Sequence, residues 1–103
     1  MTAAANKVVL NIGGKRFAIS KTNLLLFNDS LFHSLLKNSP ESDGSYFIDR
    51  NPTQFDILLD YLREGKLPAT WKELNDNNLR QLKGHFEYFG IPVPLELRTR
   101  LQD

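Results

Sequence analysis

Residues 43–52 read DGSYFIDRNP, and in this stretch a turn, a strand and a helix start are predicted to follow one another. Asp43-Gly44 is a turn signal, because both residue types accept the backbone conformations that reverse a chain. The next four residues, Tyr46–Asp49, include two aromatic residues and one β-branched residue, which favour strands. We therefore predict a short strand over residues 46–49.

The same stretch ends in a predicted helix start. Asn51 is a good N-cap, and Pro52 fits the first helical position because its missing N–H would lack a partner there anyway. Gln54 can bond back to the cap, as in a capping box. Apolar residues then recur at helical spacing and Gly65 supplies a C-terminal cap, so we expect one amphipathic helix ending there. Its apolar residues are Phe55, Leu58, Leu59 and Leu62.

Upstream, two short strands are predicted on either side of a glycine pair. Residues 7–12 read KVVLNI, with apolar side chains at every second position, and residues 15–19 read KRFAI. Gly13 and Gly14 can both take positive φ, which the two-residue turn of a hairpin requires. A phosphate-binding loop opens a helix, whereas this pair joins two strands, so a hairpin turn is favoured over a phosphate cradle.

Helices are expected in the remaining apolar segments. Ser20 and Ser30 are predicted to cap two short helices, over residues 22–27 and from residue 31 onward.

Further along, Asp76 or Asn77 is predicted to cap the last long helix, which Gly90 ends. Its apolar side chains, spaced by three, four and three residues, share one face. Residues 93–103 are compatible with a helical turn or with a linker.

The composition restricts the class of protein. The 103 residues carry 13 Lys and Arg against 12 Asp and Glu, and no cysteine. A balanced, interspersed charge lacks the basic excess that binds nucleic acid, and without cysteine there is no disulfide, thiol catalyst or Cys-based zinc site. The longest apolar run, Leu24–Phe27, is far shorter than the roughly 20 residues that span a bilayer. We therefore expect a cytoplasmic domain without direct membrane insertion.

No residue pattern indicates catalysis. Asp56 and Asp60 lie one helical turn apart, with Arg63 three residues further on, which favours a solvated or intersubunit charge network over an acid pair. His33 and His85 are each alone on a predicted helix, so hydrogen-bonded histidines are favoured over metal ligands. We expect no enzyme activity, no cofactor and no metal.

Together these segments resemble a BTB/POZ domain of the potassium-channel tetramerisation type. The resemblance begins with VLNIGG at residues 9–14, includes the DGSYFIDRNP motif and ends with EYFGI at residues 87–91. Within that family, DYLREGKL at residues 60–67 is most similar to the soluble KCTD adaptor proteins. Phe86 departs from the pattern, because the family usually has alanine there.

The resemblance implies an α+β fold, in which four to five short helices cover a three-stranded β-sheet. It also implies the domain organisation: the BTB/POZ domain over residues 7–92, and a C-terminal tail or the start of a linker over 93–103. Residues 1–6 are small and polar, so we expect a disordered N-terminus there.

The resemblance further implies a module that assembles with identical copies into a closed ring of four or five subunits. The expected partners are the chain itself and a cullin scaffold, through which the ring would serve a ubiquitin ligase complex or cluster downstream domains. The alternatives are a cytoplasmic assembly domain of a potassium-channel subunit and a monomeric anion binder at the glycine pair. Zinc cannot hold this ring through cysteine. The candidate interface residues are Arg16, Ser20, Asp49, Arg50, Asn51, Gln54 and Asp56.

Overall fold

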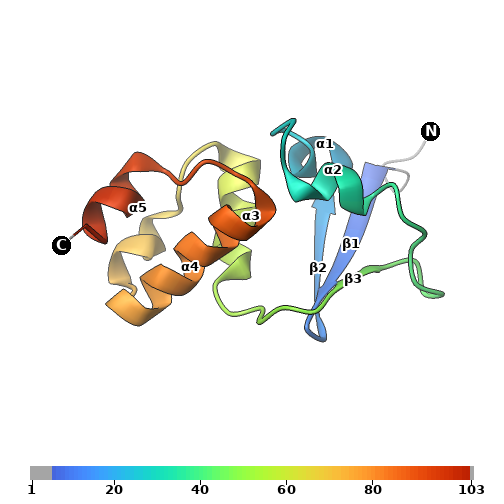
Figure 1. The fold of residues 1–103 in the computed structure, drawn as a ribbon, viewed down its shortest axis with the longest axis horizontal. Helices are drawn as coiled ribbons and strands as arrows, with labels where there is room; N and C mark the ends of the chain where they lie inside the picture. The colour runs from blue at the N-terminus through green and yellow to red at the C-terminus, as the bar shows by residue number, and fades with distance from the viewer. Residues whose placement is uncertain (1–5, 103) are drawn as a thin grey trace. The chain divides into compact units, whose positions relative to one another are not determined.

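The computed structural model describes residues 6–102 and divides at Pro52 into two compact units (Figure 1). We call residues 6–52 the sheet unit and residues 53–102 the helical unit, and describe each by itself. Of the N-terminal stretch predicted to be disordered, residues 1–5 lie outside the described residues.

The sheet unit contains the three predicted strands, in the order β2-β1-β3. β1 (Lys7–Ile12) pairs antiparallel with β2 (Lys15–Ser20) and parallel with β3 (Tyr46–Ile48). The sheet and its hairpin are therefore confirmed. With the helices described below, the α+β class is confirmed as well.

The glycine pair forms the turn between β1 and β2. Gly13 and Gly14 have φ values of 59° and 105°, as a two-residue hairpin turn requires. The N–H of Gly14 donates to Oδ1 of Asn11 at 2.8 Å, and the N–H of Gly13 donates to the carbonyl of Ile48 at 2.9 Å. Both turn N–H groups are thus used within the chain, so they are not available to cradle a phosphate.

The two faces of the sheet differ in exposure. Val8, Leu10 and Ile12 of β1 are buried on one face, and the unit's core also takes Leu24 and Phe32 from two short helices. These helices are α1 (Lys21–Leu24), which contacts β2, and α2 (Leu31–Leu35). By strand register the other face carries Asn11 and Arg16 opposite one another, with Phe47 on the far side of Asn11. Arg16 and Phe47 are exposed, so this face is open within the unit.

One of the two predicted serine caps is confirmed. Oγ of Ser20 accepts the N–H of Asn23 at 3.1 Å and starts α1, which ends at Leu24 rather than at residue 27. Ser30 precedes α2, but its hydroxyl makes no cap bond and is buried without a partner among residues 6–102. The first turn of α2 is stabilised by a backbone hydrogen bond instead, in which the N–H of His33 donates to the Ser30 carbonyl at 3.2 Å.

The predicted start of the next helix was wrong by several residues. α3 (Phe55–Glu64) begins after Gln54, so Asn51 is not its N-cap and Pro52 is not its first residue. Gln54 has φ 69° and ψ 5°, the left-handed conformation, and its side chain makes no cap bond. A left-handed residue cannot continue a right-handed helix, so residues 51–54 form an irregular segment and a turn. The predicted end is confirmed, because Gly65 adopts φ 80° and donates its N–H to the Tyr61 carbonyl.

The helical unit continues with a 3₁₀ turn, η2 (Ala69–Glu73), and then α4 (Asp76–Phe89) and α5 (Leu95–Arg100). The cap of α4 is Asn75, not Asp76 or Asn77. Oδ1 of Asn75 accepts the N–H of Asn78 at 2.8 Å, because an N-cap side chain reaches the third helical N–H. Within the C-terminal segment, Leu97 of α5 is fully buried.

Aromatic side chains form much of the core of this unit. The Phe55 and Phe89 rings lie 5.5 Å apart, and the His85 ring meets Phe55 edge-on at 5.6 Å. Phe86 is fully buried and packs edge-on against Tyr61 at 5.2 Å, so α3 and α4 meet through aromatic pairs. The Phe86 ring is thus accommodated beside a tyrosine of the neighbouring helix.

Candidate functional site

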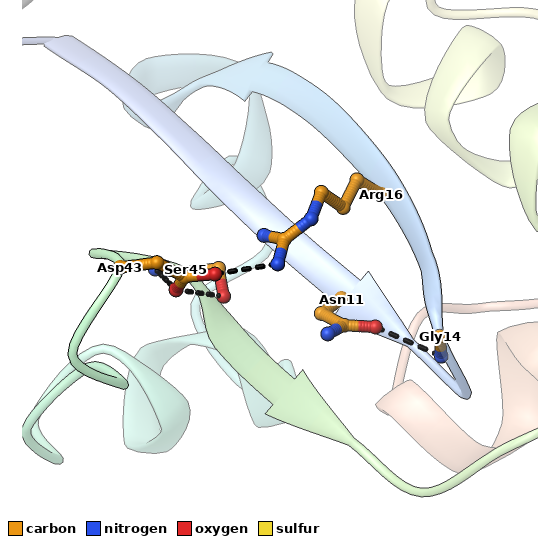
Figure 2. Close-up of polar contacts among 5 residues, drawn as sticks. All are labelled: Asn11, Gly14, Arg16, Asp43 and Ser45. Atoms are coloured by element: carbon orange, nitrogen blue, oxygen red, sulfur yellow. Dashed lines mark hydrogen bonds and ion pairs between the residues drawn. The ribbon is translucent and has the colours of Figure 1, made fainter.

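A polar cluster on the open face of the sheet joins β2 to the loop before β3. Arg16 reaches from β2 across β1 to Asp43, just before β3, and forms an ion pair of 2.5 Å with its Oδ2 (Figure 2). The other carboxylate oxygen of Asp43 accepts from the N–H of Ser45 at 2.9 Å and from its hydroxyl at 2.7 Å. Asn11, on β1 between the two outer strands, bonds the turn as described above.

These contacts stabilise the charged form of Asp43. The hydroxyl and the N–H of Ser45, followed by the Arg16 guanidinium, lower the pKa of Asp43 to about 2 from an ordinary value of 3.8. Ser45 itself is buried. The cluster therefore fixes the loop before β3 and holds the Arg16 guanidinium in place on an exposed surface.

The sequence had predicted Arg16 as an interface residue but had not identified Asp43 and Ser45 as its neighbours. The signal was present in Asp43-Gly44-Ser45, because an aspartate two residues before a serine commonly accepts that residue's N–H in a local turn. The long-range pairing of Arg16 with Asp43, 27 positions apart, had no such local signal.

The predicted interface residues Asp49, Arg50 and Asn51 follow β3, and two backbone hydrogen bonds fix the chain where they begin. The carbonyl of Ile48 accepts both the N–H of Gly13 and the N–H of Arg50, each at 2.9 Å. The hairpin turn also approaches this segment closely, since a Cβ added to Gly13 would lie 2.4 Å from the Arg50 carbonyl oxygen. Asp49 and Asn51 are exposed on this fixed segment, and Arg50 is half-buried.

The seven candidate residues fall into two groups. Arg16, Ser20, Asp49, Arg50 and Asn51 belong to the sheet unit, where Ser20 has a structural role as a helix cap.

The remaining two, Gln54 and Asp56, belong to the helical unit. Gln54 is the left-handed residue before α3, and Asp56 is exposed in the first turn of that helix. Their role at an interface remains a prediction.

Three of the residues considered for catalysis or metal binding, His33, His85 and Asp60, have structural partners. Nε2 of His33 lies 3.1 Å from the Leu25 carbonyl, and Nε2 of His85 lies 2.7 Å from the Thr53 carbonyl, so each nitrogen donates to backbone. Asp60 pairs with Arg63 at 2.9 Å. Within residues 6–102, no group of three or more His, Cys, Asp and Glu side chains could hold a metal ion, and no helix has the length and hydropathy to cross a membrane.

The chain matches the family description "BTB/POZ domain" over residues 8–97. It is 36% identical over 98 residues to human BTB/POZ domain-containing protein KCTD3, covering 91% of this chain and 11% of that protein. It is 39% identical over 96 residues to human KCTD5, covering 87% of this chain and 39% of that protein. Cattle SH3KBP1-binding protein 1 is 44% identical over 98 residues, which are 89% of this chain and 13% of that protein.

The chain thus spans a minor part of the length of these relatives, and the match includes both the sheet unit and the helical unit. The three-stranded sheet with its hairpin and helices agrees with that match. The chain therefore belongs to the BTB/POZ domain family, in its potassium-channel tetramerisation branch with KCTD relatives, which comprises protein-interaction and oligomerisation domains.

Proposed function

We propose that this domain assembles with copies of itself into a closed ring of four or five subunits, and that the ring serves as a KCTD-like adaptor. The observation that carries the proposal is the polar segment Asp49–Asn51, with Asp49 and Asn51 exposed, which follows a β3 carbonyl bonded both by the hairpin turn and by the Arg50 N–H in a chain of this family. A closed ring needs a heterologous interface, in which one face of a subunit meets a different face of the next. A polar segment with a hydrogen-bonded backbone supports such an interface, because charged groups held in place fix the register between neighbouring subunits.

Oligomer mass tests the ring. We expect light scattering coupled to size exclusion to give four or five times the mass of the 11.8 kDa chain at tens of micromolar. Each junction of the ring is expected to bury about 800 Å² per partner, as ordinary interfaces do. Asp49→Lys is expected to lower that mass, because it reverses an exposed charge on the fixed segment. Arg50→Glu is expected to do the same. Arg80→Glu, at an exposed position of α4 outside the candidate set, is the matched control.

The outcome that overturns the ring is a monomeric wild-type chain at that concentration. If the wild type is a ring and all three variants keep its mass, the ring stands and the candidate interface residues are wrong. Circular dichroism of each variant separates loss of assembly from loss of folding.

The adaptor role adds a cullin scaffold as partner, and it rests on the KCTD relatives. A ring would present several copies of the binding surface, so a multivalent partner would gain avidity without any new contact. Titration of the assembled chain with a cullin N-terminal domain, followed by calorimetry, is expected to saturate at a fixed ratio per subunit. The absence of heat or of a complex on size exclusion would leave assembly intact and reject the cullin role. The same relatives favour this role over that of a channel subunit.

A further inference from the structure

His85 contacts both neighbours of the left-handed residue Gln54. It lies on α4 and is only 3% exposed. Its Nε2 donates to the carbonyl of Thr53 at 2.7 Å, and its ring meets that of Phe55 edge-on at 5.6 Å. All four residues belong to the helical unit, in which α3 and α4 are in contact (Figure 1). One buried side chain therefore holds the chain on either side of Gln54.

The carbonyl that His85 binds lies outside the hydrogen-bond ladder of α3. In a helix that began earlier, the Thr53 carbonyl would accept the N–H of Ile57, four residues further on. That N–H donates instead to the carbonyl of Gln54 at 3.3 Å. The imidazole of His85 thus supplies a donor to a carbonyl that the helix leaves out, and this bond joins positions 32 residues apart.

The conformation of Gln54 needs such an external hold. Its φ of 69° is the left-handed conformation, which is sterically unfavourable for a residue with a Cβ. The side chain of Gln54 makes no cap bond to α3 that would compensate for this cost. A strained residue persists where the surrounding structure imposes its conformation. His85 is in the position to impose it, because it contacts the residues before and after Gln54.

We propose that His85 is a positioning residue for the ring junction and that it acts through Gln54. This inference rests on the proposed function, in which Gln54 is a candidate interface residue. The backbone conformation sets the direction in which a side chain leaves the chain, so the left-handed turn fixes where the Gln54 amide points. An amide contributes to an interface only when its donors and its acceptor are aligned with their partners. Since His85 is buried, it sets this alignment without touching the neighbouring subunit.

A matched pair of amide variants tests the donor. The side-chain nitrogen of glutamine reaches about as far from the backbone as Nε2 of histidine, whereas that of asparagine is one carbon shorter. His85→Gln is therefore expected to keep the bond to Thr53, and His85→Asn to lose it. Light scattering over a dilution series measures the concentration at which half of the chains are in the ring. We expect His85→Asn to raise this concentration about tenfold and His85→Gln to raise it less than about threefold.

The control for a general loss of stability is Leu82→Val. Leu82 is fully buried on the same helix, and the substitution removes buried volume without changing a donor. It is expected to leave the half-assembly concentration within about twofold. Circular dichroism identifies any variant that does not fold. If His85→Asn does not fold, His85→Phe is the second variant without a donor, and it keeps a ring beside Phe55.

A double-mutant cycle tests whether His85 acts through Gln54. Once Gln54→Ala has removed the amide, His85→Asn is expected to change the half-assembly concentration by less than about twofold. A full tenfold effect in the Gln54→Ala background would show that His85 affects assembly by another route, and would overturn the proposal. Equal effects of His85→Gln and His85→Asn would contradict the role of the donor.

NMR separates a failure of this inference from a failure of the ring. The backbone chemical shifts of Gln54 in the isotope-labelled chain report its conformation in any state of assembly. We expect left-handed shifts in the wild type and in His85→Gln, and their loss in His85→Asn. Unchanged shifts in His85→Asn overturn the positioning role even where the wild type forms a ring. A monomeric wild type rejects the ring and the role at its junction, and the shifts then show by themselves whether His85 fixes the turn.

Discussion

The sheet unit and the helical unit are stabilised by different kinds of interaction. In the sheet unit, glycine conformations and polar contacts fix the loops around three short strands, through the hairpin turn and the Arg16–Asp43–Ser45 cluster. In the helical unit, buried aromatic rings join α3 to α4. The stability of an apolar core depends on how completely its side chains fill the available volume. The stability of a turn depends on whether a few residues can adopt the required backbone conformation. The two units should therefore respond differently to mutation.

The largest expected effect is in the aromatic core. Phe89→Ala should lower the free energy of unfolding by about 3–5 kcal/mol, because Phe89 is fully buried between other rings and alanine leaves a cavity. Phe47→Ala, which truncates a ring 47% exposed on the sheet, should cost less than about 1 kcal/mol. Urea denaturation of both variants measures the difference, and equal losses would contradict the assignment of the aromatic core.

The next effect separates the two glycines of the hairpin turn. Gly13→Ala and Gly14→Ala each force an L-residue into positive φ, at about 1–2 kcal/mol. At Gly13 the new Cβ would also lie 2.4 Å from the Arg50 carbonyl, whereas at Gly14 nothing lies within 4 Å. Gly13→Ala should therefore be the more destabilising variant by at least about 1 kcal/mol, as measured by urea denaturation. Equal losses would indicate that the segment after β3 moves aside freely.

A smaller, stabilising effect is expected at the start of α3. Gln54→Gly should raise the free energy of unfolding by up to about 1 kcal/mol, because glycine accepts φ 69° without steric cost. Thermal unfolding measures the gain. Gln54→Ala, which keeps the steric cost and removes the amide, is the control and should not stabilise. Light scattering on both variants then shows whether the Gln54 side chain contributes to assembly.

The smallest effect is the pH dependence of the polar cluster. The pKa of Asp43 is lowered to about 2, so its carboxylate stabilises the folded state fully above its ordinary value near 3.8. That contribution is lost as the pH falls from about 4 to about 2, when the folded state must also take up the proton. The difference in urea midpoint between wild type and Asp43→Asn should thus shrink over this range. In an Arg16→Gln background the difference should persist in part, because the Ser45 bonds are the larger cause.

Local chemistry made much of the fold predictable, and the errors have physical causes. The hairpin, the Ser20 cap and the Gly65 helix end follow from residues close in sequence, and they are confirmed. The helix start at Asn51 was wrong, because good capping residues do not exclude a left-handed residue three positions later. In the candidate site, Arg16 was identified but its partner Asp43 was not, since ion pairs across a sheet depend on strand order rather than on spacing.

The sequence by itself determined the strand and helix types, most of their ends and the family, because periodicity, glycine conformation and capping act over a few residues. Only the tertiary structure decided which polar groups meet. It placed the Arg16 side chain on Asp43. The reason is that such contacts join segments many residues apart, whose approach is set by the order and register of the strands.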